Sequence, residues 1–125
     1  YADVERWATE EGYVDYICPQ IYFGFYNEAQ PFTKTAKDWA ELTTSCRLYV
    51  GLPLYKSGQE DKFASTDTDY AINEFKDNHN IISRQISYLN QLENVNGFYI
   101  YSYSYLTDKE TPSVVEEVKN IKAVM

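Results

Sequence analysis

The sequence predicts an α/β protein in which helices alternate with parallel strands. Three short runs of apolar residues, rich in β-branched and aromatic side chains, lie at 14–22, 48–55 and 98–105. They are nearly continuous rather than alternating, which is typical of parallel strands covered on both faces. Segments with helical spacing lie before, between and after these runs, and this order indicates βαβ units with right-handed crossovers.

The helices follow from the spacing of apolar residues and from residues that favour helix ends. We expect helices at 2–11, 35–45, 69–76, 78 to about 93, and from 112 onward. Asn78 can cap the fourth helix, and Thr111 with Pro112 supplies an N-cap followed by proline at the first helical position. Most connections after the strands are longer than those before them. In α/β proteins, such loops at the carboxyl ends of the strands carry the sites.

The length of 125 residues fits a single domain. A free-standing doubly wound domain normally has about five strands and a glycine-rich phosphate-binding turn, and the sequence contains neither. A leading helix followed by three strand–helix units is better explained as the last three strands of a (β/α)8 TIM barrel of about 250 residues. We therefore interpret residues 1–125 as one domain that forms the C-terminal part of a larger barrel.

Charge and composition argue against several classes of function. The chain has 11 Lys and Arg against 19 Asp and Glu, and the net charge of −8 argues against a nucleic-acid partner or an anionic membrane surface. No apolar run approaches the ~20 residues of a membrane span, so we expect no membrane insertion. Cys18, Cys46 and the single His79 lack the spacing of a zinc site. We therefore expect buried free thiols and neither a metal nor a cofactor.

Tyrosine is unusually frequent, with 13 residues in the chain. Its flat apolar face and its hydroxyl suit carbohydrate stacking, but they also suit protein interfaces and half-buried strands. In the third apolar run, one parity set consists of tyrosines alone, at 99, 101, 103 and 105. Periodicity does not decide whether this set, or the set that begins with Phe98 and Ile100, faces the interior of a barrel.

Three motifs resemble those of one family. Residues 12–22 read GYVDYICPQIY, residues 49–56 read YVGLPLYK, and RQ at 84–85 precedes GFYIYSY at 97–103. With this spacing, over most of 3–106, they resemble the C-terminal half of glycosyl-hydrolase-like family 10 catalytic domains, which are bacterial (β/α)8 barrels. The resemblance implies that the three strands are the sixth, seventh and eighth of the barrel. It also implies that the catalytic carboxylates lie upstream of this chain.

The resemblance further implies a glycoside hydrolase that acts on a polysaccharide or an oligosaccharide. This part would contribute contacts to the carbohydrate substrate and would be inactive alone. Such an activity would suit an extracellular or cell-envelope protein. Two alternatives stay open, a non-catalytic carbohydrate-binding module and a protein-interaction module of barrel topology, because a high tyrosine content fits each of them.

Candidate substrate-binding side chains lie where the three strands end. They are Gln20, Tyr22, Tyr55, Lys56, Tyr101, Ser102 and Tyr103. Gln20 and Tyr22 share one parity and point to the same side, where an amide and a phenol can hydrogen-bond sugar hydroxyls and stack on a ring. In the alternative interpretation, Gln20 lies in a strand bulge and satisfies only backbone groups, and Lys56 is solvated beside a structural tyrosine.

Glycoside cleavage usually needs two carboxyl groups about 5–10 Å apart, one of them with a raised pKa. The candidates at the loop ends are Glu28, Glu60, Asp61 and Asp108. Adjacent acids in a loop, such as Glu60 and Asp61, are usually solvated, and no pair has a spacing that demands catalysis. We therefore assign no catalytic residue within this chain.

Half a barrel leaves two open sheet edges, which are prone to pair with other chains. We therefore expect the isolated 125-residue chain to self-associate. A symmetric dimer that covers both edges is the simplest form of such an assembly.

Overall fold

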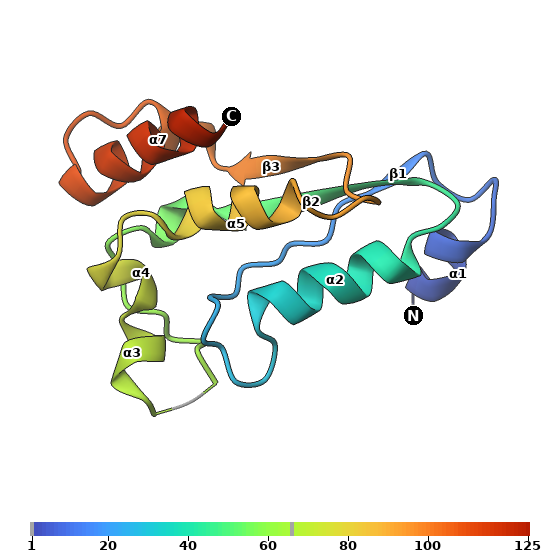
Figure 1. The fold of residues 1–125 in the computed structure, drawn as a ribbon, viewed down its shortest axis with the longest axis horizontal. Coiled ribbons are helices and arrows are strands. Elements are labelled where there is room, and N and C mark those ends of the chain that lie inside the picture. The colour runs from blue at the N-terminus through green and yellow to red at the C-terminus, as the bar shows by residue number, and fades with distance from the viewer. Residues whose placement is uncertain (1, 66) are drawn as a thin grey trace.

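The computed structural model describes residues 2–65 and 67–125 and confirms the α/β class (Figure 1). Three parallel strands form one sheet in the order β1-β2-β3. Their bounds are Tyr16–Ile17 for β1, Arg47–Pro53 for β2 and Gly97–Tyr101 for β3. Helices connect successive strands, as the alternation of apolar runs and helical segments predicts.

The expected helices are present, with shifted bounds. The elements are α1 (Val4–Thr9), α2 (Phe32–Leu42), η1 (Leu54–Lys56, a 3-10 turn), α3 (Asp69–Ile72), α4 (Glu74–Asp77), α5 (Ile81–Leu89), α6 (Tyr103–Leu106) and α7 (Pro112–Val124). The second helix begins three residues earlier than expected, since Phe32 is buried in the core and Thr35 already bonds back to Pro31 within the first turn. The helix expected at 69–76 is divided at Asn73 into α3 and α4.

Pro19 shortens the first strand. The expected run at 14–22 forms only a two-residue strand, because proline has no N–H to donate to the ladder. Pairing resumes at once, with an isolated bridge between Gln20 and Gly51. The pairs Ile17–Leu48 and Gln20–Gly51 keep one register, so no extra residue is inserted. The alternative that places Gln20 in a strand bulge is therefore wrong.

The third strand ends at Tyr101, four residues before the end of the apolar run. Ser102 then leads into α6, where the Tyr105 N–H donates to the Ser102 carbonyl at 3.1 Å. Within β3, Phe98 and Ile100 pack against the core while Tyr99 and Tyr101 are exposed. Because side chains alternate along a strand, the tyrosines of β3 lie on the sheet face opposite the helices.

Helices bury one face of the sheet. In Figure 1, α5 lies across β2, and α2 and α7 flank it. Val50, Leu52 and Leu54 are fully buried in a core to which these three helices contribute, for example through Phe32 of α2 and Ile86 of α5. Burying a side chain of this size contributes roughly 1.5–3 kcal/mol. No helix among the described residues is long and apolar enough to cross a membrane.

A distant carboxylate caps α5. Asn80, its N-cap residue, makes no side-chain capping bond, and Asn78, which the sequence suggested as a cap, donates instead to the Glu74 carbonyl. The buried Glu117 of α7 takes this role, because its Oε1 accepts the Ser83 N–H at 2.9 Å. A carboxylate at this position satisfies an otherwise unpaired donor and suits the helix dipole. The cap therefore ties α7 to the start of α5.

The burial of Glu117, whose effect on the pKa exceeds the opposing effect of the capping hydrogen bonds, predicts a pH-dependent contribution to stability. Burial raises the pKa of the Glu117 carboxyl above the usual value of 4.5. The stabilising contribution is therefore complete below about pH 4.5 and is lost as the pH rises through the folded-state pKa. The neutral Glu117→Gln variant lacks this titration. We expect the free energies of urea unfolding of the two proteins to diverge from about pH 4.5 to 7, with the variant becoming the more stable protein. A difference that does not change with pH would contradict the raised pKa of Glu117.

Candidate functional site

Three tyrosines converge at the carboxyl ends of the strands, on the sheet face that the helices leave open. The ring centroids of Tyr22 and Tyr55 are 5.9 Å apart, those of Tyr22 and Tyr101 are 6.3 Å apart, and those of Tyr55 and Tyr101 are 6.0 Å apart. Tyr105 of α6 joins them, 6.4 Å from Tyr55. We call these four residues the carboxyl-end tyrosine cluster. The edge-on and tilted contacts are those that aromatic pairs prefer.

Two phenols of this cluster, those of Tyr22 and Tyr55, remain protonated at neutral pH. Burial raises the pKa of Tyr22, and the neighbouring phenols add to the effect. Burial also raises the pKa of Tyr55, with a further contribution from the Asp61 carboxylate. A neutral phenol can both donate and accept a hydrogen bond, so the cluster combines aromatic faces with hydroxyls that suit a neutral, hydroxyl-rich ligand.

A second set of tyrosines covers the same face nearer the amino ends of the strands. Tyr16 and Tyr49 lie 5.7 Å apart, and Tyr49 and Tyr99 lie 5.5 Å apart, both with edge-on geometry. We call these three residues the amino-end tyrosine row. All three strands therefore contribute tyrosines to the open face, at both ends of the sheet.

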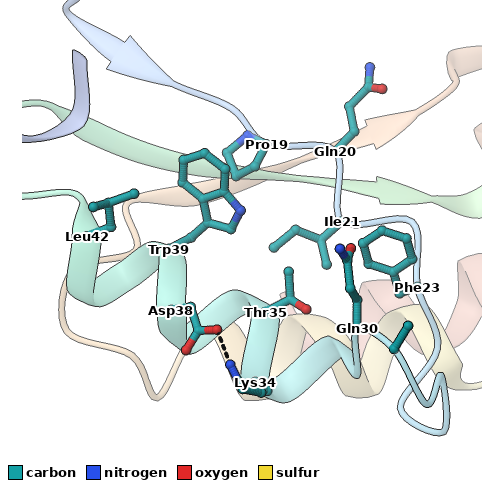
Figure 2. Close-up of a pocket in the computed structure, with 11 residues that line it drawn as sticks. Pro19, Gln20, Ile21, Phe23, Gln30, Lys34, Thr35, Asp38, Trp39 and Leu42 are labelled. Carbon is teal, nitrogen blue, oxygen red and sulfur yellow. Dashed lines mark hydrogen bonds and ion pairs between the residues drawn. The ribbon is translucent and has the colours of Figure 1, made fainter. Parts of the chain in front are cut away.

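The other predicted polar contacts lie around the cluster. Gln20 is exposed and extends away from α2 (Figure 2), and its amide has no hydrogen-bond partner among the residues that the structure describes. Ser102 directly follows β3 and shares a hydrogen bond of 3.0 Å with Ser104. Tyr103 begins α6 and is highly exposed. The structure thus brings Tyr22, Tyr55 and Tyr101 together and leaves the Tyr103 side chain in solvent.

Lys56 is buried rather than solvated. Only 7% of its surface is exposed, and its Nζ donates to Asp61 Oδ1 at 2.8 Å and to the Tyr22 carbonyl at 2.6 Å. The expectation that Asp61 is solvated is also wrong, since this side chain is buried and additionally accepts the Phe63 N–H. The ion pair joins the turn after β2 to the backbone of Tyr22. It therefore helps to hold one tyrosine of the cluster in place.

The remaining loop carboxylates show no catalytic pair. Glu60 is exposed and bonds to Lys76 at 2.7 Å, and this lysine lowers the pKa of the Glu60 carboxyl. Asp108 receives hydrogen bonds at the start of α7, first of all from the Thr111 side chain, and they lower its pKa. Glu28 is exposed. Because a general acid in glycoside cleavage needs a raised pKa, neither Glu60 nor Asp108 suits that role.

Glu74 is a buried carboxylate that lies in no motif of the sequence. Burial raises its pKa, as would suit a general acid, but its two oxygens accept the N–H groups of Phe25 and Tyr26 at 2.8 and 3.1 Å. The side chain is 1% exposed, so a substrate cannot reach it. Glu74 therefore holds the loop after β1, and only its long-range partners identify this role.

A groove of about 650 Å³ lies between the edge of the sheet and α2 (Figure 2). Pro19, Ile21 and Trp39 form part of its apolar lining, and the ion pair of Lys34 with Asp38 lies on the α2 side. The groove faces the helices and includes no tyrosine of the cluster. Gln20, a predicted site residue, also lines the groove, so the groove adjoins the candidate site without including its tyrosines.

The two thiols are free, as expected, but they are half-buried rather than buried. Burial raises the pKa of both Cys18 and Cys46, which keeps them protonated at neutral pH. Within residues 2–65 and 67–125, no group of three or more His, Cys, Asp and Glu side chains is arranged to hold a metal ion.

Comparison with known proteins finds relatives of the chain that are named glycosyl hydrolase. The protein named glycosyl hydrolase DigH from Escherichia coli O6:H1 (strain CFT073) is 32% identical to it over 122 residues. The proteins of that name from Escherichia coli K12 and Shigella flexneri are 31% identical over the same length. The chain is similar to glycosyl hydrolases. The matches cover 96% of this chain and 26% of each relative, so the chain spans about a quarter of their length. No protein-family model matches the chain.

The buried ion pair beneath the cluster predicts a large and non-additive effect of substitution. Lys56→Met leaves the Asp61 carboxylate buried without its counter-ion, so we expect the free energy of unfolding to fall by about 3–5 kcal/mol. In Lys56→Met/Asp61→Leu no buried charge remains, and part of the loss should be recovered. Chemical unfolding measures both. Lys34→Met, which breaks an exposed pair with Asp38, is the control and should cost less than about 1 kcal/mol. Equal losses in the single and double variants would contradict this account.

Proposed function

We propose that the chain is the C-terminal part of a glycoside hydrolase with a (β/α)8 barrel, of the glycosyl-hydrolase-like family 10 type. The barrel would consist of this chain and an upstream part that supplies the first five strands and the catalytic carboxylates. The similarity to proteins named glycosyl hydrolase, over 96% of this chain, supports the carbohydrate substrate. The substrate itself would be a polysaccharide or an oligosaccharide.

The observation that carries the proposal is the open tyrosine face of the sheet. Helices bury one face, while the other presents Tyr22, Tyr55 and Tyr101 in mutual contact at the carboxyl ends of three parallel strands. In a (β/α)8 barrel the helices lie outside, the opposite face becomes the interior, and the carboxyl ends of the strands form the active-site end. The cluster would therefore lie at the active-site end of the barrel.

Each predicted residue has a role in this proposal. The rings of Tyr22, Tyr55 and Tyr101 would stack on sugar rings and bind their hydroxyls, since a tyrosine combines an apolar face with a polar group. Gln20 and Ser102 would add hydrogen bonds, and the exposed Tyr103 would contact a more distant part of the substrate. Lys56 would act indirectly, by holding the Tyr22 carbonyl and Asp61.

The cluster is tested by comparing tyrosines at the two ends of the open face. Tyr101 and Tyr16 are 57% and 54% exposed, and each lies in edge-on contact with another tyrosine. In the full-length protein, we expect Tyr101→Ala and Gln20→Ala to lower kcat/KM about tenfold, equivalent to about 1.4 kcal/mol. Tyr16→Ala should leave kcat/KM unchanged because it lies at the opposite end. Unchanged kinetics for both Tyr101→Ala and Gln20→Ala would exclude the site assignment.

A non-catalytic carbohydrate-binding module is the alternative that a specific observation favours. The cluster offers aromatic faces and neutral hydroxyls, whereas the loop carboxylates considered above form no catalytic pair. Saturable oligosaccharide binding by the full-length protein without release of reducing ends would support this alternative. Release of reducing ends would support the hydrolase.

We also propose that the 125-residue chain alone self-associates. β1 and β3 are the edge strands of the sheet, and the open face carries exposed aromatic side chains, which favour pairing and association. Light scattering at tens of micromolar should give the mass of a dimer or a larger assembly. In the full-length protein these edges would be paired within the same chain. Its fold should therefore not require self-association. A monomeric mass for the isolated chain would contradict the proposal.

A further inference from the structure

Two further tyrosines form an exposed pair outside the carboxyl-end cluster. Tyr26 lies in the loop after β1 and Tyr70 lies in α3, and their ring centroids are 5.1 Å apart at an interplanar angle of 83°. Both are exposed, by 52% and 60%. In Figure 1, α3 lies on the side toward which β2 and β3 point, beyond the ends of the strands. We call this pair the rim pair.

The backbone that carries Tyr26 is held by a buried carboxylate. Glu74 accepts the N–H groups of both Phe25 and Tyr26, and it lies so close to Gly24 that a Cβ there would overlap the carboxylate. The ring of Phe25, the residue before Tyr26, lies 4.7 Å from the Arg84 guanidinium and packs edge-on against Phe32. The position of Tyr26 is therefore determined by contacts on several elements.

A buried amide joins this loop to the loop that follows β2. Asn27 Nδ2 donates to the Phe63 carbonyl at 2.9 Å, and Asn27 Oδ1 accepts the Gln30 N–H at 2.8 Å. Asn27 is almost fully buried. The two long loops are thus held to each other at Asn27 and Phe63, close to the backbone of Tyr26.

This construction is costly for an ordinary surface loop. Removing a carboxylate from water is unfavourable unless hydrogen bonds compensate for it. The chain nevertheless buries Glu74, together with the Asn27 amide, to hold a loop whose most exposed aromatic residue is Tyr26. A ring that is held in place before a ligand binds loses less conformational entropy on binding. An exposed and perpendicular aromatic pair, of which Tyr26 has its backbone held in place, has the features of a binding surface.

We infer that the rim pair is a second carbohydrate subsite, which stacks a neutral sugar ring of a chain that extends outward from the carboxyl-end tyrosine cluster. The inference rests on the proposed function. Two perpendicular rings offer one face for the C–H groups of a pyranose and a phenolic hydroxyl for its polar groups. Carboxylates adjoin both tyrosines in the sequence, Glu28 near Tyr26 and Asp69 beside Tyr70, and the net charge is −8. This charge favours a neutral sugar over an anionic one.

The test uses full-length protein and neutral oligosaccharides of two to six units, namely cello-, xylo- and chito-oligosaccharides. Binding is measured by calorimetry for the wild type, Tyr26→Ala/Tyr70→Ala and the surface variant Tyr70→Ala alone. We expect the double variant to bind the hexasaccharide about tenfold more weakly and the disaccharide or trisaccharide as the wild type does. Tyr26→Phe/Tyr70→Phe, which keeps both rings, should retain most of the hexasaccharide affinity. Thermal unfolding checks that each variant is folded.

Tyr13→Ala is the matched control. Tyr13 is 47% exposed and precedes β1, at the amino-terminal end of the strands, so its removal should leave binding of every oligosaccharide unchanged. If the double variant and Tyr70→Ala both bind the hexasaccharide as the wild type does, while Tyr101→Ala weakens binding of short and long chains alike, the rim subsite is wrong and the proposed function stands. If the wild type binds no oligosaccharide of the panel, the rim subsite for a neutral sugar is wrong, and the proposed function is still decided by the release of reducing ends from a polysaccharide.

Discussion

The described structure depends on a sheet that is covered on one side. Val50, Leu52 and Leu54 are buried beneath α2, α5 and α7, while Tyr16, Tyr49 and Tyr99 of the three strands lie on the face away from the helices. Parallel sheets are ordinarily covered on both faces. A face of tyrosines can stay in contact with water, because the rings pack against one another and the hydroxyls remain open to polar partners.

Buried charged side chains determine the loops around this sheet. Glu117 caps a helix from a distance, Glu74 holds two consecutive N–H groups, and Lys56 with Asp61 joins a turn to the backbone of Tyr22. Glu117, Glu74 and Lys56 each bond to the main chain of a segment far from them in the sequence. Long connections at the carboxyl ends of the strands are thereby fixed without regular secondary structure of their own.

The alternation of helices and strands was predictable, because apolar periodicity and helix-terminal residues are local signals. The meeting of Tyr22, Tyr55 and Tyr101 was also predictable, since residues that end neighbouring parallel strands lie at one edge of a sheet. The short first strand was also predictable, because Pro19 has no N–H to donate to the ladder. The burial of Lys56 and the roles of Glu74 and Glu117 were not accessible, because each depends on partners brought together only by the fold. The half-burial of the thiols likewise depends on which face of the sheet is covered.

The contact between Gly24 and the Glu74 carboxylate has an evolutionary consequence. Because any Cβ at position 24 would overlap the Glu74 carboxylate, amino-acid substitutions at positions 24 and 74 are coupled. A homologue that loses the acid at position 74 no longer needs glycine at position 24, and one that acquires a larger residue at position 24 must first give up the acid. The two sites should therefore be inherited as a unit, and their joint replacement would mark lineages in which the first loop has been rebuilt.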